Sequence, residues 1–389
     1  MTEDELLHYT DLVAIGNIAD SMDISDYELR YMVNQGLNNI SNELIKEYLE
    51  DAKLEGDITP TDVSFNIANK INGTIRYGSM EEKIDLFRAL IGEEEEREYT
   101  PRKSRSNPNP TTEIQSLQKA MVRISKSAKQ RQDNAKKKCI EKCKKFVEEN
   151  NMNDNKAIIV VDKDNEFIDK KITGLVAMGL VDHFKKSVII LSKSKDKFMG
   201  SMRGYGVDNL KEILESTEII KVTGHANSAG VEVEPKDMAR LEKRVNKAFE
   251  DIEVVPPCTL VDCVIDTKTV REKDMREILE MKSVWHQHCK EPMFLIKDVI
   301  VETKDVRIPY TTLMVFELDG IEVQKPFCSG VFKEQFLHTN EVKFGKPTLE
   351  CDLIVKIGYD SYKRKPCLII VEAETRIVKK TNKKDNIPF

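Results

Sequence analysis

The chain has 389 residues, of which 40% are hydrophobic and 33% are charged, and its formal net charge is −6 at pH 7. This length allows two or three domains with separate cores, while the net charge argues against a generally basic nucleic-acid-binding protein. No apolar run approaches the roughly 20 residues of a membrane span, and the start MTEDELLHYT does not resemble a signal peptide. We therefore expect an intracellular, cytoplasmic protein, whose eight cysteines are reduced.

Amphipathic helices fill most of the first hundred residues. Apolar side chains recur at helical spacing in segments 26–40, 42–54, 61–73 and 80–92. We expect these helices to expose an apolar face that a separate partner chain covers. The alternative is that they close into a bundle of their own.

A change of composition marks the best domain boundary of the chain. In residues 92–113, GEEEEREYTPRKSRSNPNPTTE, an acidic run gives way to a basic stretch rich in Ser, Pro and Asn, which is typical of a flexible connection. Residues 114–150 then predict one long basic linker helix, capped by Thr111 or Thr112. Eleven Lys or Arg residues fall between positions 119 and 145, which favours a polyanion beside this helix, with a solvated connector as the alternative.

The pattern becomes α/β from residue 157. Apolar runs predict strands at 157–164 and 187–191, and helical spacing predicts helices at 172–184, at 206–217 with a cap near Asp208, and at 234–252. From Pro256 to about Arg376, alternating runs predict a small β-barrel or sandwich, with strands at 294–303, 311–318, 351–359 and 367–375.

A glycine-rich segment with a histidine, KVTGHANSAGVEVEP (residues 221–235), interrupts the α/β pattern. Two short predicted strands, 219–222 and 231–233, flank a nearly bare backbone. Exposed N–H groups, the Ser228 hydroxyl and the His225 imidazole suit a phosphate, because glycine removes the Cβ that would hold an anion away. The alternative is a glycine-rich turn with a packed histidine.

Five separated segments carry a family resemblance. ITGLVAMGLVDHFKKSVIIL (172–191), GSMRGYGVDNLKEILE (200–215) and VTGHANSAGVEVEP (222–235) resemble, in this order, the DHH-associated substrate-binding domain of RecJ-type single-stranded-DNA exonucleases. VAIGNIAD (13–20) resembles the fourth catalytic motif of that family, and WHQHCKEPMFLIKDVIV (285–301) is similar to the entry into its OB-like barrel. The resemblance implies phosphodiester hydrolysis of single-stranded DNA in the 5′-to-3′ direction with Mn²⁺ or Mg²⁺.

The resemblance also implies site residues. Asp20 matches the metal-binding aspartate of the fourth motif, and a carboxylate oxygen suits manganese or magnesium. The chain departs from the family pattern at Thr223, Asn227 and Ser228, which adds hydrogen-bonding groups. The residues implied to hold a DNA phosphate or terminus are Ser201, Arg203, Gly224, His225, Ser228 and Gly230.

The Asp-x-Asp and Asp-His-His motifs of the family do not occur in this sequence, which has no adjacent histidine pair. One aspartate does not hold a two-metal centre. We therefore expect the DNA-binding half of a RecJ-like enzyme, which needs a separate chain with those motifs. The C-terminal strands are also compatible with a viral origin. The expected parts are a helical remainder of a DHH domain (1–95), the linker with its long helix (96–150), an α/β DHH-associated domain (154–252) and an OB-like β domain (256–378).

Two other functions stay open. One is a non-catalytic module that binds single-stranded nucleic acid. The other is a DHH phosphodiesterase acting on short oligonucleotides or a cyclic dinucleotide, against which the C-terminal β region argues, because small-substrate relatives generally lack it.

Two further groups of side chains are candidates for binding. Zinc prefers ligands such as Cys258, Cys263, His286, His288 and Cys289, although their spacing is not that of a standard zinc finger. The aromatic residues that are candidates for stacking on bases are Trp285, Phe294, Tyr310 and Tyr205, with buried core positions as the alternative.

Overall fold

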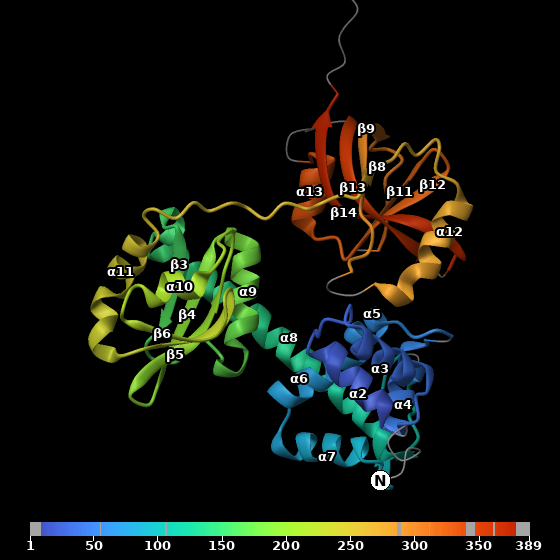
Figure 1. Ribbon diagram of the computed structural model, residues 1–389. Coiled ribbons are helices and arrows are strands. Elements are labelled where there is room, and N and C mark those ends of the chain that lie inside the picture. Colours follow the sequence, from blue (N-terminus) through green and yellow to red (C-terminus); the bar gives the residue numbers. More distant parts are fainter. Residues whose placement is uncertain are drawn as a thin grey trace, which may run out of the picture. The chain divides into compact units, whose positions relative to one another are not determined.

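The computed structural model describes residues 9–54, 56–105, 107–285, 289–310, 312–339, 347–360 and 362–378. Helices dominate its first hundred residues (Figure 1). The four expected helices are confirmed, and the third is divided because a π-helical turn separates two shorter pieces. The segments are α2 (Thr10–Ala19), α3 (Tyr27–Asn38), α4 (Glu43–Ala52), α5 (Pro60–Val63), the π-helical turn Ser64–Ala68, α6 (Asn69–Tyr77) and α7 (Met80–Leu90).

Side-chain caps fix where these helices begin. The side chain of Asn42 accepts two backbone N–H groups at the start of α4, and Ser79 with Glu82 forms a reciprocal capping box at the start of α7. The inner face of α4 holds Tyr48, whose buried hydroxyl lies 2.7 Å from the Ser125 hydroxyl. Burial raises the pKa of Tyr48 to about 12.

The long basic helix is confirmed as α8 (Leu117–Glu149), with 33 residues. Its cap is Ser116, whose hydroxyl accepts the backbone N–H of Lys119 at 3.2 Å, so the expected cap at Thr111 or Thr112 is wrong. The reason is a two-stranded antiparallel ribbon, β1 (Glu96–Tyr99) and β2 (Glu113–Ser116), which holds the residues before the helix extended.

The α/β part contains a five-stranded sheet in the order β3-β4-β5-β7-β6, in which β3 and β4 are parallel and the other neighbours antiparallel. Strand β5 was not predicted. Helix α10 begins after Asn209, whose side chain caps it. The strands are β3 (Ala157–Asp162), β4 (Ser187–Ser194), β5 (Lys197–Arg203), β6 (Ile220–His225) and β7 (Ser228–Val233). The helices are α9 (Thr173–Phe184), α10 (Leu210–Glu215), the 3-10 turn Pro235–Arg240 and α11 (Leu241–Ala248).

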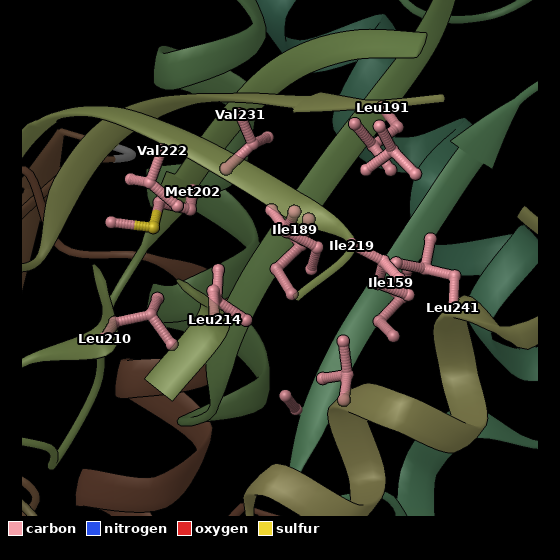
Figure 2. Close-up of a cluster of buried hydrophobic side chains, with 14 of the residues drawn as sticks. Ile159, Ile189, Leu191, Met202, Leu210, Leu214, Ile219, Val222, Val231 and Leu241 are labelled. Carbon is pink, nitrogen blue, oxygen red and sulfur yellow. The ribbon is translucent and has the colours of Figure 1, made fainter. Parts of the chain in front are cut away.

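The two faces of this sheet are covered differently. On one face, side chains of all five strands pack with α10 and α11 into a core that includes Ile189, Met202, Val222, Val231 and Leu241 (Figure 2). On the other face, α8 and α9 cover the buried residues of β3 and β4. Burial alternates along β5, β7 and β6, so their outward residues on the α9 side stay partly or fully exposed.

The C-terminal part is confirmed as β-rich but contains two helices that were not predicted, α12 (Glu272–Glu280) and α13 (Gly330–Leu337). Its mixed sheet has the order β10-β11-β12-β14-β13-β9-β8. Both outer strands have one neighbour among the described residues, so the pairing does not close and an OB-like barrel is not confirmed. The strands are β8 (Cys263–Val264), β9 (Phe294–Glu302), β10 (Arg307–Tyr310), β11 (Leu313–Leu318), β12 (Ile321–Pro326), β13 (Thr348–Asp360) and β14 (Lys365–Ile377).

Contacts divide the chain into two units. One holds Gln35–Gly56 and Asp62–Cys258 together with helix α2, and the other holds Asp20–Asn34, Asp57–Thr61 and the residues from Thr259 onward. The expected division into four domains stays a prediction. Within the described residues, none of the helices combines the length and apolarity that crossing a bilayer requires.

Candidate functional site

The expected phosphate-binding residues come together on one face of the five-stranded sheet. Across β5, β7 and β6, Arg203 pairs with Ser228 and Ser228 with His225. Side chains of directly opposite residues in antiparallel strands point to the same face, so these three form one row. This face is the one covered by α9, because Arg203 also lies opposite the buried Val188 of β4.

A second row lies two residues along the same strands. Ser201 pairs with Gly230, and Gly230 pairs with Thr223. A Cβ on Gly230 would have no atom closer than 3.7 Å, so this glycine leaves a shallow bare spot between two hydroxyl side chains. The two rows place five of the six expected residues together and add Thr223, which the sequence marked only as a departure from the family pattern.

The backbone of the glycine-rich segment is bare only in part. The segment is a tight hairpin with only Ala226 and Asn227 between its strands, and β7 is paired along its length with β5 and with β6. The N–H groups of β7 are therefore used by the sheet. Polar contacts to an anion at this face must come mainly from side chains.

Gly224 has a different position from the other five residues. It lies opposite the buried Ala229, and its φ of +135° is a conformation that residues with a side chain rarely adopt. A Cβ on Gly224 would lie 3.0 Å from the Cβ of Ala229. This glycine therefore permits the hairpin geometry and does not line the polar face.

Arg203 is the one strongly basic side chain of the two rows. Its guanidinium is half-buried, and Nη1 donates to the carbonyl oxygen of Met202 at 2.7 Å. Burial lowers the pKa of this guanidinium, and the nearby positive charge of Arg76 lowers it further. Among the described residues no carboxylate forms an ion pair with Arg203, so a half-buried cation remains available to an anion.

The first turn of α9 borders this cation. The hydroxyl oxygens of Thr173 and Ser201 lie 2.8 Å apart. A Cβ on Gly174 would lie only 2.5 Å from Nη2 of Arg203, so the guanidinium occupies the space that the missing side chain leaves. The amino end of a helix also favours anions. These two α9 residues were not predicted as parts of the site, and the only signal for them was the small residues of segment 172–184.

Asn227 serves the fold of the neighbouring loop. Its side-chain amide donates to the carbonyl oxygens of Val207 and Asp208, both at 3.0 Å, and its oxygen accepts the backbone N–H of Leu210 at 3.1 Å. Because all of these bonds are internal, this departure from the family pattern supports the loop before α10 and leaves the substrate contacts to the strand residues.

The metal prediction rests on Asp20, which lies in the turn after α2 with an exposed side chain. Asp11 is fully buried, and its carboxylate accepts the backbone N–H groups of Ser41 at 2.9 Å and Asn42 at 2.7 Å. Over the described ranges, no three His, Cys, Asp or Glu side chains gather as metal ligands. The described residues therefore do not form a metal centre, and the role of Asp20 stays a prediction.

The zinc candidates are only partly described. Cys258, Cys263 and Cys289 are exposed and form no ligand cluster with other described residues, whereas His286 and His288 lie outside the described residues. The zinc site stays a hypothesis.

The aromatic candidates differ in exposure. Trp285 and Phe294 are buried, and Tyr205 is half-buried against the α8 and α9 core. Trp285 and Phe294 therefore lack a ring face that is open to a base, and stacking on Tyr205 stays a prediction. Tyr310 is 71% exposed and retains one.

The chain is similar in sequence to two proteins that are named as single-strand DNA-specific exonucleases. The chain is 30% identical, over 96% of its length, to a protein of Bacillus subtilis (strain 168) named as an SPbeta prophage-derived single-strand DNA-specific exonuclease, YorK. It is 26% identical, over 78% of its length, to the single-stranded-DNA-specific exonuclease RecJ of the same organism. It spans 65% and 36% of these relatives. No family model matches the chain.

Solved structures show the same fold. RecJ from Thermus thermophilus in complex with Mn²⁺ superposes with a TM-score of 0.67 at 18% identity, covering 95% of this chain and 50% of that one. The Mg²⁺ complex of the same protein gives a TM-score of 0.66 at 17% identity, covering 95% and 52%.

Proposed function

We propose that this chain is a RecJ-like protein and forms the DNA-binding part of a metal-dependent 5′-to-3′ exonuclease that acts on single-stranded DNA, because its sequence is similar to two single-strand-specific exonucleases and its fold is similar to that of RecJ. The supporting observation is the row of Arg203, Ser228 and His225, in which a half-buried cation without an acidic partner among the described residues lies beside a hydroxyl and an imidazole. A phosphate satisfies all three groups, and the planar guanidinium can bind two of its oxygens.

Helix α8 extends the basic surface available to a strand. Several of its cations are already neutralised, as in the pairs Lys126 with Asp51 at 2.7 Å and Arg131 with Glu82 at 2.6 Å. Lys137, Lys138 and Lys145 are exposed, and no ion pair holds them within the part of the chain that the structure describes. We assign these three lysines to the phosphates of a bound strand. If replacing them leaves single-strand binding unchanged, α8 is only a solvated connector.

The proposed metal dependence rests on the similar structures, because RecJ from Thermus thermophilus was solved in complex with Mn²⁺ and with Mg²⁺. A divalent metal would polarise the phosphodiester and activate water. Asp20 is the residue of this chain assigned to metal binding. One exposed aspartate does not hold a metal pair, so the described residues alone do not fit this centre and the remaining ligands must come from other residues.

An exposed apolar stripe on α7 supports a partner chain that supplies the missing metal ligands. Met80, Ile84, Phe87 and Ile91 follow one another at helical spacing and are 70%, 52%, 63% and 61% exposed. Such a stripe on a surface helix marks an interaction site. We propose that a polypeptide carrying Asp-x-Asp and Asp-His-His motifs covers it. Replacing Ile84 and Phe87 by Ser should abolish reconstituted cleavage and leave DNA binding by the isolated chain unchanged.

The function is tested by the salt dependence of single-strand binding. Each phosphate contact contributes about 0.7 to the slope of log affinity against log salt, so Arg203→Ala should lower the slope by about that amount and weaken binding about tenfold at low salt. Arg244→Ala is the matched control, because Arg244 is an exposed arginine on α11, across the sheet from the site. Equal binding by both variants would refute the site.

A second candidate function is a binding module without catalysis. The observation that favours it is the lack of a metal-ligand cluster among the described residues. Reconstituted cleavage with a chain carrying the missing motifs would exclude this candidate, while cleavage restricted to short oligonucleotides would favour a small-substrate phosphodiesterase.

A further inference from the structure

A cavity of about 460 Å³ lies in the C-terminal unit. Its volume is within the range of small-ligand sites. It is lined by strands β10, β11 and β12 and by the hairpin that joins β13 to β14. Its lining includes Arg307, Tyr310, Glu322, Tyr359, Tyr362 and Lys363.

The cavity opens on the outer face of the sheet. Met314, Phe316 and Val323 point into the hydrophobic core, so the alternating residues Val315 and Gln324 point outward. The strand register places Arg307 opposite Val315 and Val315 opposite Gln324. An apolar floor and polar side chains therefore share one solvent-facing surface.

Three tyrosines surround this surface. Tyr310 is 71% exposed, Tyr359 is 44% exposed and Tyr362 is 95% exposed. They come from strand β10, from the end of strand β13 and from the turn after it. Exposed aromatic rings around a cavity cost solvation free energy unless a ligand covers them, and flat rings offer stacking faces to planar ligands.

Carboxylates form the polar part of the cavity. The Glu322 side chain is 15% exposed, and the Gln324 amide bridges it to Asp360, with distances of 2.7 Å to Glu322 Oε1 and 3.0 Å to Asp360 Oδ2. Asp360 also accepts the backbone N–H groups of Tyr362 at 2.9 Å and Lys363 at 3.0 Å. These donors, led by Lys363, hold the pKa of Asp360 below its usual range. The polar part of the cavity thus presents carboxylate acceptors, which suit the amino group of a heterocyclic base.

Cations stand at the rim. Lys363 pairs with Glu322, and Arg307 lies 3.8 Å from the same carboxylate. The Lys363 and Arg307 side chains are 46% and 64% exposed, so both cations can also contact a phosphate outside the cavity. Stacking faces, buried acceptors and rim cations match the base, the amino group and the phosphates of a nucleotide.

We propose that this pocket binds one amino-bearing nucleobase of a single DNA strand, stacked on the tyrosines, with the flanking phosphates on Arg307 and Lys363. Cytosine and adenine present an amino group to Glu322, whereas thymine presents carbonyl oxygens beside its one N–H. This inference rests on the proposed function, because it assumes that single-stranded DNA is the ligand.

The test measures binding of fluorescently labelled oligo-dC, oligo-dT and an abasic oligonucleotide to the full chain. Base stacking is the larger effect, so Tyr310→Ala with Tyr362→Ala should weaken oligo-dC binding about tenfold and leave the abasic oligonucleotide unaffected. Tyr27→Ala is the control, since Tyr27 is 84% exposed in helix α3. Glu322→Gln keeps the shape and should reduce the preference for dC over dT.

Each failure has a distinct signature. If Arg203→Ala weakens binding while the tyrosine variants bind oligo-dC like the unmodified chain, the pocket assignment is wrong and the proposed function survives. If neither set weakens binding, the proposed function itself fails. Competition by free dCMP with the affinity of oligo-dC would also overturn the assignment to a strand.

Discussion

The hydroxyl oxygens of Thr173 and Ser201 lie 2.8 Å apart, which joins the first turn of helix α9 to the central part of strand β5. The contact fixes the distance between the helix and the strand at the point where Gly174 and Arg203 also meet. Substitutions at these positions therefore act on the guanidinium that we assign to a phosphate.

The sharpest test of that geometry is Gly174→Ala. The added methyl group would displace the guanidinium, so we expect single-strand affinity to fall about tenfold, as for loss of a charge-assisted hydrogen bond. The free energy of unfolding should change by less than about 1 kcal/mol, because alanine favours helix and the long arginine side chain can move. Gly16→Ala in α2 is the control, since its Cβ meets no atom within 4 Å. Unchanged affinity in Gly174→Ala would contradict the placement.

Asn227→Ala should weaken the fold. Three internal hydrogen bonds are lost, and buried polar groups left without partners cost free energy, so we expect the free energy of unfolding to fall by about 2 kcal/mol. Urea denaturation followed by circular dichroism measures this change. Asn134→Ala, at an exposed position of α8, should have no comparable effect, and equal midpoints for the two variants would disprove the structural role.

Alanine substitutions of Asp11 and Asp20 should have opposite effects on stability and on cleavage. Asp11→Ala leaves the N–H groups of Ser41 and Asn42 without their acceptor, which should lower the free energy of unfolding by about 2 to 3 kcal/mol. Asp20→Ala should leave stability unchanged, because its side chain is exposed, and should reduce only metal-dependent cleavage after reconstitution. A stable Asp11→Ala variant that loses cleavage would instead make Asp11 a ligand.

The thiols should fall into two reactivity classes. Cys258, Cys263 and Cys289 are exposed and should react with a disulfide reagent in the native state. Burial raises the pKa of Cys143, and likewise of Cys351 and Cys367, to about 12, so these thiols stay protonated at pH 8 and should react only on unfolding. Counting released thiolate before and after adding denaturant measures this. Rapid native reaction of more than three thiols would contradict the core packing.

Much of the fold was predictable because the elements have clear periodicity. Helix α8 and strands β3 and β4 follow directly from apolar spacing. Strand β5 was missed because KFMGSMR contains a glycine and a serine and lacks alternation, so only pairing with β4 and β7 makes it a strand. The boundary region also differs, since Ile114 continues the helical spacing but belongs to the exposed face of β2.

The site was predictable only as a set of residue types. The resemblance supplied Ser201, Arg203 and His225, and the strand register brings them to one face. The expected backbone donors are lost along β7, because a glycine-rich sequence does not reveal that the N–H groups of this strand pair within a sheet. Gly174 and Arg203 are far apart in the sequence, and only the crossing of α9 over β5 makes them neighbours.

The most direct test incubates the purified chain alone with end-labelled single-stranded DNA and Mn²⁺ and follows binding and cleavage in the same reaction. The DNA-binding role predicts binding that weakens with added salt and with Arg203→Ala, and no shortening of the strand. Metal-dependent cleavage by the chain alone would contradict this account, because it would require a metal centre that the described residues do not form.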